Sequence, residues 1–446
     1  MSAEPAAPPF EVSHRSVLSI AVPMTLAYLT TPLVGIVSLG VIGQLGDPAL
    51  VGGVSIGGLV FDILFMTFSF LRSGTTGLVA QSFGADDRRE IAATLYRAGL
   101  LAVAIGAAIV ALQVPLLAIA QTLIGGSAAV RVATRAYFDI RVFAAPVALL
   151  NYVILGWLIG IGRAGYGLFL QAVLNGINIV LSVSLVHGLG WGVAGVGWAS
   201  LAAEATTSVV GVVVVWRLRH PGPRPTLAEI VDRAAFRRMF AVNRDIMIRT
   251  FALLLAFAFF TARNAAHGDV VLAANEILMN LIVLAAYFLD GTAAAAEQLA
   301  GRAIGARHRP SFERVVGLTI GWGYAVGAAA SLLFLLGGGA LVDVMTTSDA
   351  VRATARTYLW LAALFPVVGT LAYQMDGVFI GATWSVDMRN MMLVALAAYF
   401  VAWWFLERAF GVAGLWVALL VFLAVRGATL VWRSRVRIGP AFQDPG

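Results

Sequence analysis

The sequence predicts an all-α integral membrane protein with twelve transmembrane helices in two pseudo-symmetric six-helix lobes. Three observations support this prediction: the composition, the number of long apolar runs, and an internal repeat. Hydrophobic residues make up 60% of the 446 residues and charged residues only 12%. That is too little polar surface to cover a soluble globule.

Twelve apolar runs have the length of about 20 residues that crosses a bilayer as a helix. They begin near Ser16, Ala49, Ala92, Phe138, Gly165, Val193, Phe240, Val271, Val315, Leu359, Met391 and Val412. An even number of spans places both termini on one side of the membrane.

The basic residues, all of them arginine, indicate which side this is. Most lie between the runs on the side of the termini, with the densest set from Arg217 to Arg238. Cytoplasmic loops are enriched in arginine, so we expect both termini in the cytoplasm and a multi-pass protein of the cell inner (plasma) membrane. This placement also accounts for the net charge of +7 without a nucleic-acid partner. The segment Ser2 to Glu11 is not basic, so no signal peptide is expected.

The two halves of the chain repeat in sequence. Ser127-Ala-Ala-Val-Arg131 recurs as Ser348-Asp-Ala-Val-Arg352, an offset of 348 − 127 = 221. Further pairs at nearly this offset are Pro146 and Pro366, Gly84 and Gly305, Ala21 and Ala241, and Gly192 and Gly411. Six helices separate the copies, so the halves have the same orientation, an arrangement common in transporters.

The most polar interruption, which contains Pro221, Pro223 and Pro225, is interpreted as the linker between the halves. We therefore predict five parts: a cytoplasmic tail at 1–15, an N-lobe at 16–219, a cytoplasmic linker at 220–239, a C-lobe at 240–435 and a cytoplasmic tail at 436–446.

One carboxylate lies inside a run of membrane-spanning length. The stretch 373–383 carries Asp376, and its copy at 152–160 carries Leu155 at that position. A charge at membrane depth costs a few kcal/mol or more, so Asp376 is a candidate functional residue. Removal from water favours the protonated carboxyl, which suits a group that loads and unloads a proton. The alternative is a carboxylate that is always paired with an arginine and only supports packing.

Several stretches resemble the multidrug and toxic-compound extrusion (MATE) transporters, and most closely their DinF-like branch. They are LRSGTTGLVAQSFGA (71–85), NRDIMIR (243–249), LDG (289–291) followed by Glu297, the Asp376 stretch, and LAVRG (423–427). The resemblance extends from about His14 to Arg437. It implies twelve helices in two lobes and export of organic compounds, driven by inward flow of protons or sodium ions.

The chain departs from the family in its first helix. Many relatives carry an aspartate there that is held to be central to cation coupling, whereas this sequence has Ser38. Serine does not exchange a proton near neutral pH, although its hydroxyl could ligate sodium. The coupling role therefore moves toward the acids of the C-lobe.

Asp290 and Glu297 are seven residues apart (297 − 290), so they point to one face of the eighth helix. With Asn275, Asn280, Tyr373 and Asp376 they could form a pocket that accepts protons or coordinates sodium through oxygens. The alternative for Glu297 is an ion pair with the basic loop that follows it.

Five residues are candidates for a gate or for ion pairs. Asp245 and Arg249 are at the i,i+4 spacing that allows pairing, whereas Arg244 and Asp245 are adjacent and should not face each other. A salt bridge near the cytoplasmic end, structural or gating, is the expectation. Arg72 and Arg426 are either counter-ions of the buried acids or anchors at the interface.

Pro23, Pro32, Pro146 and Pro366 lie inside apolar runs, where proline bends or breaks a helix. Bends of this kind would let a lobe open around a cleft. Proline is also frequent in spanning helices that do not move.

The residues and the resemblance together predict a secondary active antiporter. It would exchange a proton, or a sodium ion, for an organic compound of cationic and amphipathic character. Two other transport functions stay open: flipping of a lipid-linked precursor, which would require an arginine-rich cleft, and export of organic anions. We expect a monomer in the lipid bilayer.

We expect no enzymatic activity, no metal site and no cofactor. The coupling ion would be H⁺ or Na⁺. The sequence GVSIG at 53–57 fits the hydrolase elbow but lies in a spanning run. GIGRAG at 160–165 follows a helix instead of the strand that a dinucleotide site needs. The five histidines are far apart in sequence.

Overall fold

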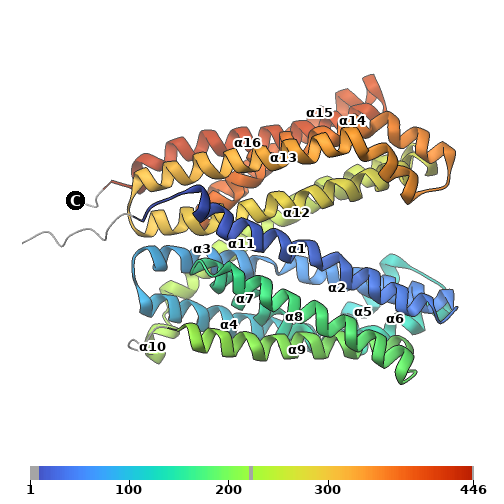
Figure 1. Ribbon diagram of the computed structural model, residues 1–446, viewed down its shortest axis with the longest axis horizontal. Helices are drawn as coiled ribbons and strands as arrows, with labels where there is room; N and C mark the ends of the chain where they lie inside the picture. The colour runs from blue at the N-terminus through green and yellow to red at the C-terminus, as the bar shows by residue number, and fades with distance from the viewer. Residues whose placement is uncertain (1–9, 220–224, 444–446) are drawn as a thin grey trace, which may run out of the picture. The chain divides into compact units, whose positions relative to one another are not determined.

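The computed structural model describes residues 10–219 and 225–443 (Figure 1). Within these residues there are twelve helical spans long and apolar enough to cross a membrane. Each contains one of the twelve predicted runs, which confirms the predicted class. The expected tails at 1–9 and 444–446 and the linker segment at 220–224, with Pro221 and Pro223, lie outside the described residues.

Contacts divide the described chain into two compact units. The N-terminal unit contains residues 26–79, 87–219 and 225–237. Its helices, two of which continue beyond the unit, are α1 (His14–Gly43), α2 (Pro48–Thr67), α3 (Phe70–Gly84), α4 (Arg88–Ala111), α5 (Gln113–Ile124), α6 (Ala128–Arg141), η1 (Val142–Ala144), α7 (Ala145–Gly160), α8 (Ala164–Val183), η2 (Ser184–Gly188), α9 (Gly192–Leu218) and α10 (Leu227–Ile230).

The C-terminal unit contains residues 10–25, 80–86 and 238–443. Its helices are the first part of α1, the end of α3, and α11 (Arg233–Ala266), α12 (Asp269–Gly305), α13 (Arg309–Met345), α14 (Asp349–Gly381), α15 (Ser385–Phe410) and α16 (Val412–Ala441).

Two segments from the first half of the chain thus pack within the C-terminal unit. Gln81 Nε2 donates hydrogen bonds to the Gly381 carbonyl and to Thr383 Oγ1, each at 3.0 Å. Gly291 approaches Thr25 so closely that a Cβ at this position would overlap its side chain. α1 and α3 therefore contribute to both units, whereas the predicted lobes are continuous in sequence.

The sequence repeat is also a repeat of helix packing. In the N-terminal unit, Gly156 of α7 lies against the carbonyl of Arg72 on α3. In the C-terminal unit, Gly377 of α14 lies against the carbonyl of Ala293 on α12, at an offset of 377 − 156 = 221. Glycine permits this close approach of two helix backbones because it has no side chain.

The four prolines occupy different positions in their helices. Pro146 lies in the first turn of α7, directly after the 3₁₀ turn η1, so here the chain changes helix type. Pro366 lies inside α14, and Pro23 and Pro32 lie inside α1, which continues through both. Only Pro146 coincides with an interruption of a spanning segment.

Candidate functional site

Asp376 lies in the most buried of the twelve spans, α14, and is 4% exposed. Its Oδ2 forms ion pairs with Arg249 of α11 and Arg426 of α16. Three helices of the C-terminal unit therefore meet at one ionic cluster. We call Arg249, Asp376 and Arg426 the ionic triad.

The local sequence of α14 fixes the position of the triad. Gly377 and Gly381 bring α14 against the backbone of α12 near Ala293 and Glu297. One turn earlier, Gln374 Nε2 donates to Thr292 Oγ1 of α12 at 2.7 Å. The glycines and the amide hold α14 on one side, so Asp376 faces α11 and α16 instead.

The two arginines differ in their surroundings. Arg426 is only 1% exposed, whereas the Arg249 side chain is 19% exposed. A buried arginine needs a partner, because an uncompensated charge in the interior is strongly unfavourable. Asp376 supplies this partner, so the two side chains form an ion pair within the C-terminal unit.

One carboxylate oxygen of the triad is left over. Asp376 Oδ1 is buried and accepts no hydrogen bond from the residues that the structure describes. A buried polar atom without a partner requires an explanation, and an unfilled binding function is one. Both arginines pair with Oδ2, so they do not occupy Oδ1.

Asp290 and Glu297 both lie on α12, in the stretch that packs against α14. Asp290 is half-buried and Glu297 is buried. Gln374 also donates to the carbonyl of Leu289, at 3.3 Å, next to Asp290. α12 thus carries two carboxylates along its contact with the helix of Asp376. Tyr373, three residues before Asp376, is half-buried.

The two asparagines do not join this cluster, contrary to the expected pocket. Asn275 is buried near the opposite end of α12, where its Nδ2 donates to Asn264 Oδ1 at 2.6 Å and its Oδ1 accepts from Trp416 Nε1 at 3.0 Å. Asn280 is exposed and donates to the carbonyl of Glu276. Asn275 is 290 − 275 = 15 residues from Asp290, or about 22 Å along a straight helix. The rise of the helix therefore keeps Asn275 away from Asp290, although the two residues are close in sequence.

Asp245 has different partners from the one expected. This carboxylate is 0% exposed, and its Oδ1 lies 3.2 Å from Arg244 and 2.7 Å from Arg389 of α15. Its Oδ2 accepts a hydrogen bond from Ser385 Oγ at 3.1 Å. The predicted pair with Arg249 is wrong, because Arg249 turns to Asp376. The neighbour that was excluded, Arg244, reaches Asp245 through its long side chain.

A second buried acid in this region had no predicted role. Asp387, in the first turn of α15, pairs with Arg433 at 2.6 Å and with Arg437 at 2.5 Å, both on α16. The sequence does indicate that the two arginines can share one partner, because Arg433 and Arg437 are at i,i+4 and lie on one face of α16.

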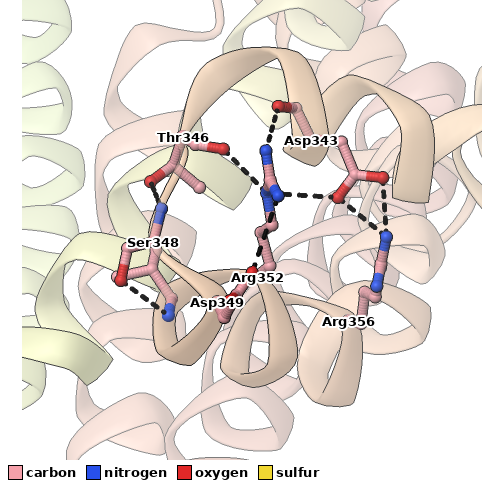
Figure 2. Close-up of polar contacts among 7 residues, drawn as sticks. Asp343, Thr346, Ser348, Asp349, Arg352 and Arg356 are labelled. Carbon is pink, nitrogen blue, oxygen red and sulfur yellow. Dashed lines mark hydrogen bonds and ion pairs between the residues drawn. The ribbon is translucent and has the colours of Figure 1, made fainter.

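The repeated serine–arginine motif is structural in both copies. Ser127 caps α6 and Ser348 caps α14, each by accepting a hydrogen bond from a backbone N–H three residues later. Figure 2 shows the second copy, where Arg352 Nε donates to the Thr346 carbonyl at 2.8 Å. Arg356 Nη2 contacts both carboxylate oxygens of Asp343, at 2.7 and 2.6 Å (Figure 2). These contacts close the connection between α13 and α14.

The N-terminal unit contains its own half-buried polar pair. Asn151 Nδ2 donates to Glu204 Oε2 at 2.7 Å and to the Glu204 carbonyl at 3.0 Å, and so links α7 to α9. Ser38, which stands in place of the family's aspartate, is buried in α1. Arg72 Nη2 donates to Ser73 Oγ at 2.9 Å.

Comparisons with known proteins agree with this architecture. The MatE family model matches twice, at residues 23–184 and 246–407, with starts 246 − 23 = 223 residues apart. The chain is 39% identical over 433 residues to the DNA damage-inducible protein F of Escherichia coli K12, which covers 96% of this chain and 94% of the relative.

Two more distant proteins extend the comparison. A protein of Rhodopseudomonas palustris named "Probable multidrug resistance protein NorM" is 27% identical, covering 93% of this chain and 90% of that protein. A solved structure described as the outward-facing conformation of a multidrug resistance MATE family transporter superposes with a TM-score of 0.84 at 18% identity, covering 96% of each chain. The chain therefore belongs to the MATE family of membrane transporters, in its DinF-like branch.

Proposed function

We propose that the protein is a secondary active efflux transporter that exports organic compounds in exchange for protons or sodium ions. The family and the names of its relatives support efflux, and the duplicated units support alternating access. In the proposed topology both termini are cytoplasmic. One observation carries the coupling proposal: a buried carboxylate, Asp376, pairs with two arginines through Oδ2, while its Oδ1 accepts no hydrogen bond from the described residues.

The ionic triad gives ion binding a route to a change of conformation. Protonation of Asp376 would remove the negative charge that both Arg249 and Arg426 face. Arg426 is buried, and an uncompensated charge in the interior is strongly unfavourable, so the packing of α14 and α16 would have to change. An ion drives transport only if it binds the two conformations with different affinity, and loss of both ion pairs supplies that difference.

Asp290 and Glu297, both on α12, are further acids in the proposed coupling role. A sodium ion would need several oxygen ligands, and α12 carries two carboxylates along its contact with α14. Each charge that moves down the membrane potential supplies about 2.3 kcal/mol per 100 mV. That energy is enough for export against a modest concentration gradient.

Dye efflux from everted membrane vesicles tests the proposal, with a proton gradient and a sodium gradient imposed in turn. We expect Asp376→Asn to abolish ion-driven efflux at equal expression. The matched control is Asp343→Asn, which neutralises an acid at the end of α13 (Figure 2) and should keep efflux. Full efflux by the Asp376 variant would refute the coupling role.

A second candidate, export of organic anions, is favoured by the charge of the triad. Two arginines face one aspartate, so the cluster has an excess of positive charge. A substrate carboxylate could pair with one arginine when Asp376 is protonated. The same vesicles distinguish the candidates: uptake of an anionic dye such as fluorescein, without uptake of ethidium, would indicate an anion exporter.

A further inference from the structure

The N-terminal unit has a groove that the transport cycle proposed above does not use. α8 and α9 lie side by side (Figure 1), and a groove of about 820 Å³ runs along their cytoplasm-assigned end. Apolar side chains form most of its lining, including Phe169 on α8 and Val209 and Val213 on α9. Its only charged lining residues in the described chain are Arg163 and Arg217.

The two arginines lie at one end of the groove because of the helix directions. α8 begins just after Arg163, and α9 ends just after Arg217, so both guanidinium groups belong to the same end of the antiparallel pair. Both side chains are exposed. The groove is therefore apolar along its length and positively charged at one end.

The floor of the groove is well defined, and the space above it is open. Val210, Val214 and Leu218 belong to or pack on a small core with Trp157 and Leu158 of α7, so protein lies beneath them. At the charged end, a Cβ added to Gly165 would meet no atom within 4 Å. The trough is therefore not filled by the side chains around it.

We propose that this groove binds one anionic phospholipid, with its phosphate between Arg163 and Arg217 and its acyl chains along the valines of α9. Both helices span the membrane, so the apolar part of the groove faces hydrocarbon and the arginines reach the headgroup level. Arginine pairs with phosphate through two parallel hydrogen bonds, and basic pockets between spanning helices on the cytoplasmic side suit anionic headgroups. This inference does not depend on the coupling role of Asp376.

Native mass spectrometry of the full-length purified protein tests the proposal. The protein is incubated with phosphatidylglycerol or with phosphatidylcholine of the same acyl chains, and the retained lipid is counted. We expect phosphatidylglycerol to be retained preferentially. The double variant Arg163→Gln/Arg217→Gln should lose at least about tenfold in affinity for phosphatidylglycerol, with little change for phosphatidylcholine.

Two matched controls separate binding at the groove from general effects. Arg233→Gln/Arg237→Gln removes the same charge from exposed positions at the start of α11, outside the groove, and should leave retention unchanged. Gly165→Leu fills the trough and should weaken lipid binding with both arginines present. Gly176→Leu adds the same side chain at another open position of α8 and should not.

Several outcomes would overturn the proposal. Equal retention of the two lipids by the wild type would exclude recognition of the anionic headgroup. Unchanged retention of phosphatidylglycerol by the double arginine variant would exclude this groove. Displacement of the lipid by inorganic phosphate would show a site for the free anion instead.

Unchanged thermal unfolding of all four variants would show that each is folded.

Discussion

The two copies of the glycine-containing stretch have the same backbone contact but different side-chain chemistry. Gly156 and Gly377 each bring their helix against the carbonyl of a neighbouring helix. The residue before each glycine differs: Leu155 in the N-terminal unit and Asp376 in the C-terminal unit. A duplicated scaffold thus keeps its helix contacts while one copy carries a charge in its core.

The partners of Asp376 have no charged counterparts in the first half. By the offsets of nearby repeat pairs, Arg249 corresponds to Leu29 (249 − 29 = 220) and Arg426 to Thr207 (426 − 207 = 219). All three positions of the ionic triad are therefore uncharged in the N-terminal unit. A buried charge is stable only with its partners, so the three residues form one ionic unit.

The N-terminal unit places its carboxylate elsewhere. Glu204 is paired with the amide of Asn151, and the equivalent positions of the C-terminal unit are Leu423 (204 + 219) and Ala372 (151 + 221). Each unit has an apolar residue at the position where the other carries its carboxylate. The units therefore share an architecture but hold their carboxylates in different ways: one between arginines, the other against an amide.

The largest expected effect follows from making the second copy like the first at one position. Asp376→Leu leaves Arg249 and Arg426 without their common partner. We expect it to reduce the free energy of unfolding by about 3–5 kcal/mol, because it leaves buried charge uncompensated. Unfolding of the purified protein in mixed detergent micelles measures this loss.

The triple variant Asp376→Leu/Arg249→Leu/Arg426→Thr is the control for this loss. It reproduces the three residues of the N-terminal unit and removes all three charges of the ionic triad, so most of the lost stability should return while efflux stays absent. If the single and triple variants were equally unstable, the loss could not be assigned to the arginines.

The glycine contacts should show equal effects in the two units. Gly377→Ala and Gly156→Ala each place a methyl group against a backbone carbonyl. We expect each to cost about 1–3 kcal/mol of unfolding free energy through overpacking. Thermal unfolding measures both, with Gly176→Ala, at an open position, as the neutral control. A loss in only one unit would show that the contacts are not equivalent.

A smaller effect is expected at the acid of the N-terminal unit. Glu204→Gln keeps an oxygen that can accept the hydrogen bond from Asn151, so stability should change by less than about 1 kcal/mol. If coupling is confined to the C-terminal unit, this variant should also keep ion-driven dye efflux. Its loss of efflux, with normal expression and folding, would move part of the coupling to the first unit.

The smallest effects are expected at the two exposed ion pairs of the repeated motif, one of which is drawn in Figure 2. Arg356→Gln removes the contact with Asp343, which is partly open to solvent. Such pairs contribute about 0–1 kcal/mol, so thermal unfolding should change little. Arg135→Gln, at the equivalent position of the first copy, removes a longer contact of 3.4 Å with Asp139 and should change it even less. A large loss at Arg356 would mean that this connection stabilises the unit.

The sequence alone determined the twelve spans, the repeat and the buried acid. The length of each apolar run determines a span because a bilayer requires about 20 such residues, whatever their neighbours are. The offset near 221 appears again in the paired glycine contacts and in the two MatE matches. Asp376 could be identified from the sequence because a charged residue within an apolar run is visible however the helices pack.

Tertiary structure decided which groups meet. The i,i+4 rule suggested Arg249 for Asp245, because spacing along one helix describes only local neighbours. The packing of α11, α14 and α16 instead brings Arg249 and Arg426, 127 and 50 residues from Asp376 (376 − 249 and 426 − 376), to one carboxylate. The groove between Arg163 and Arg217 has the same origin: two arginines placed at one end by an antiparallel helix pair, which no local pattern contains.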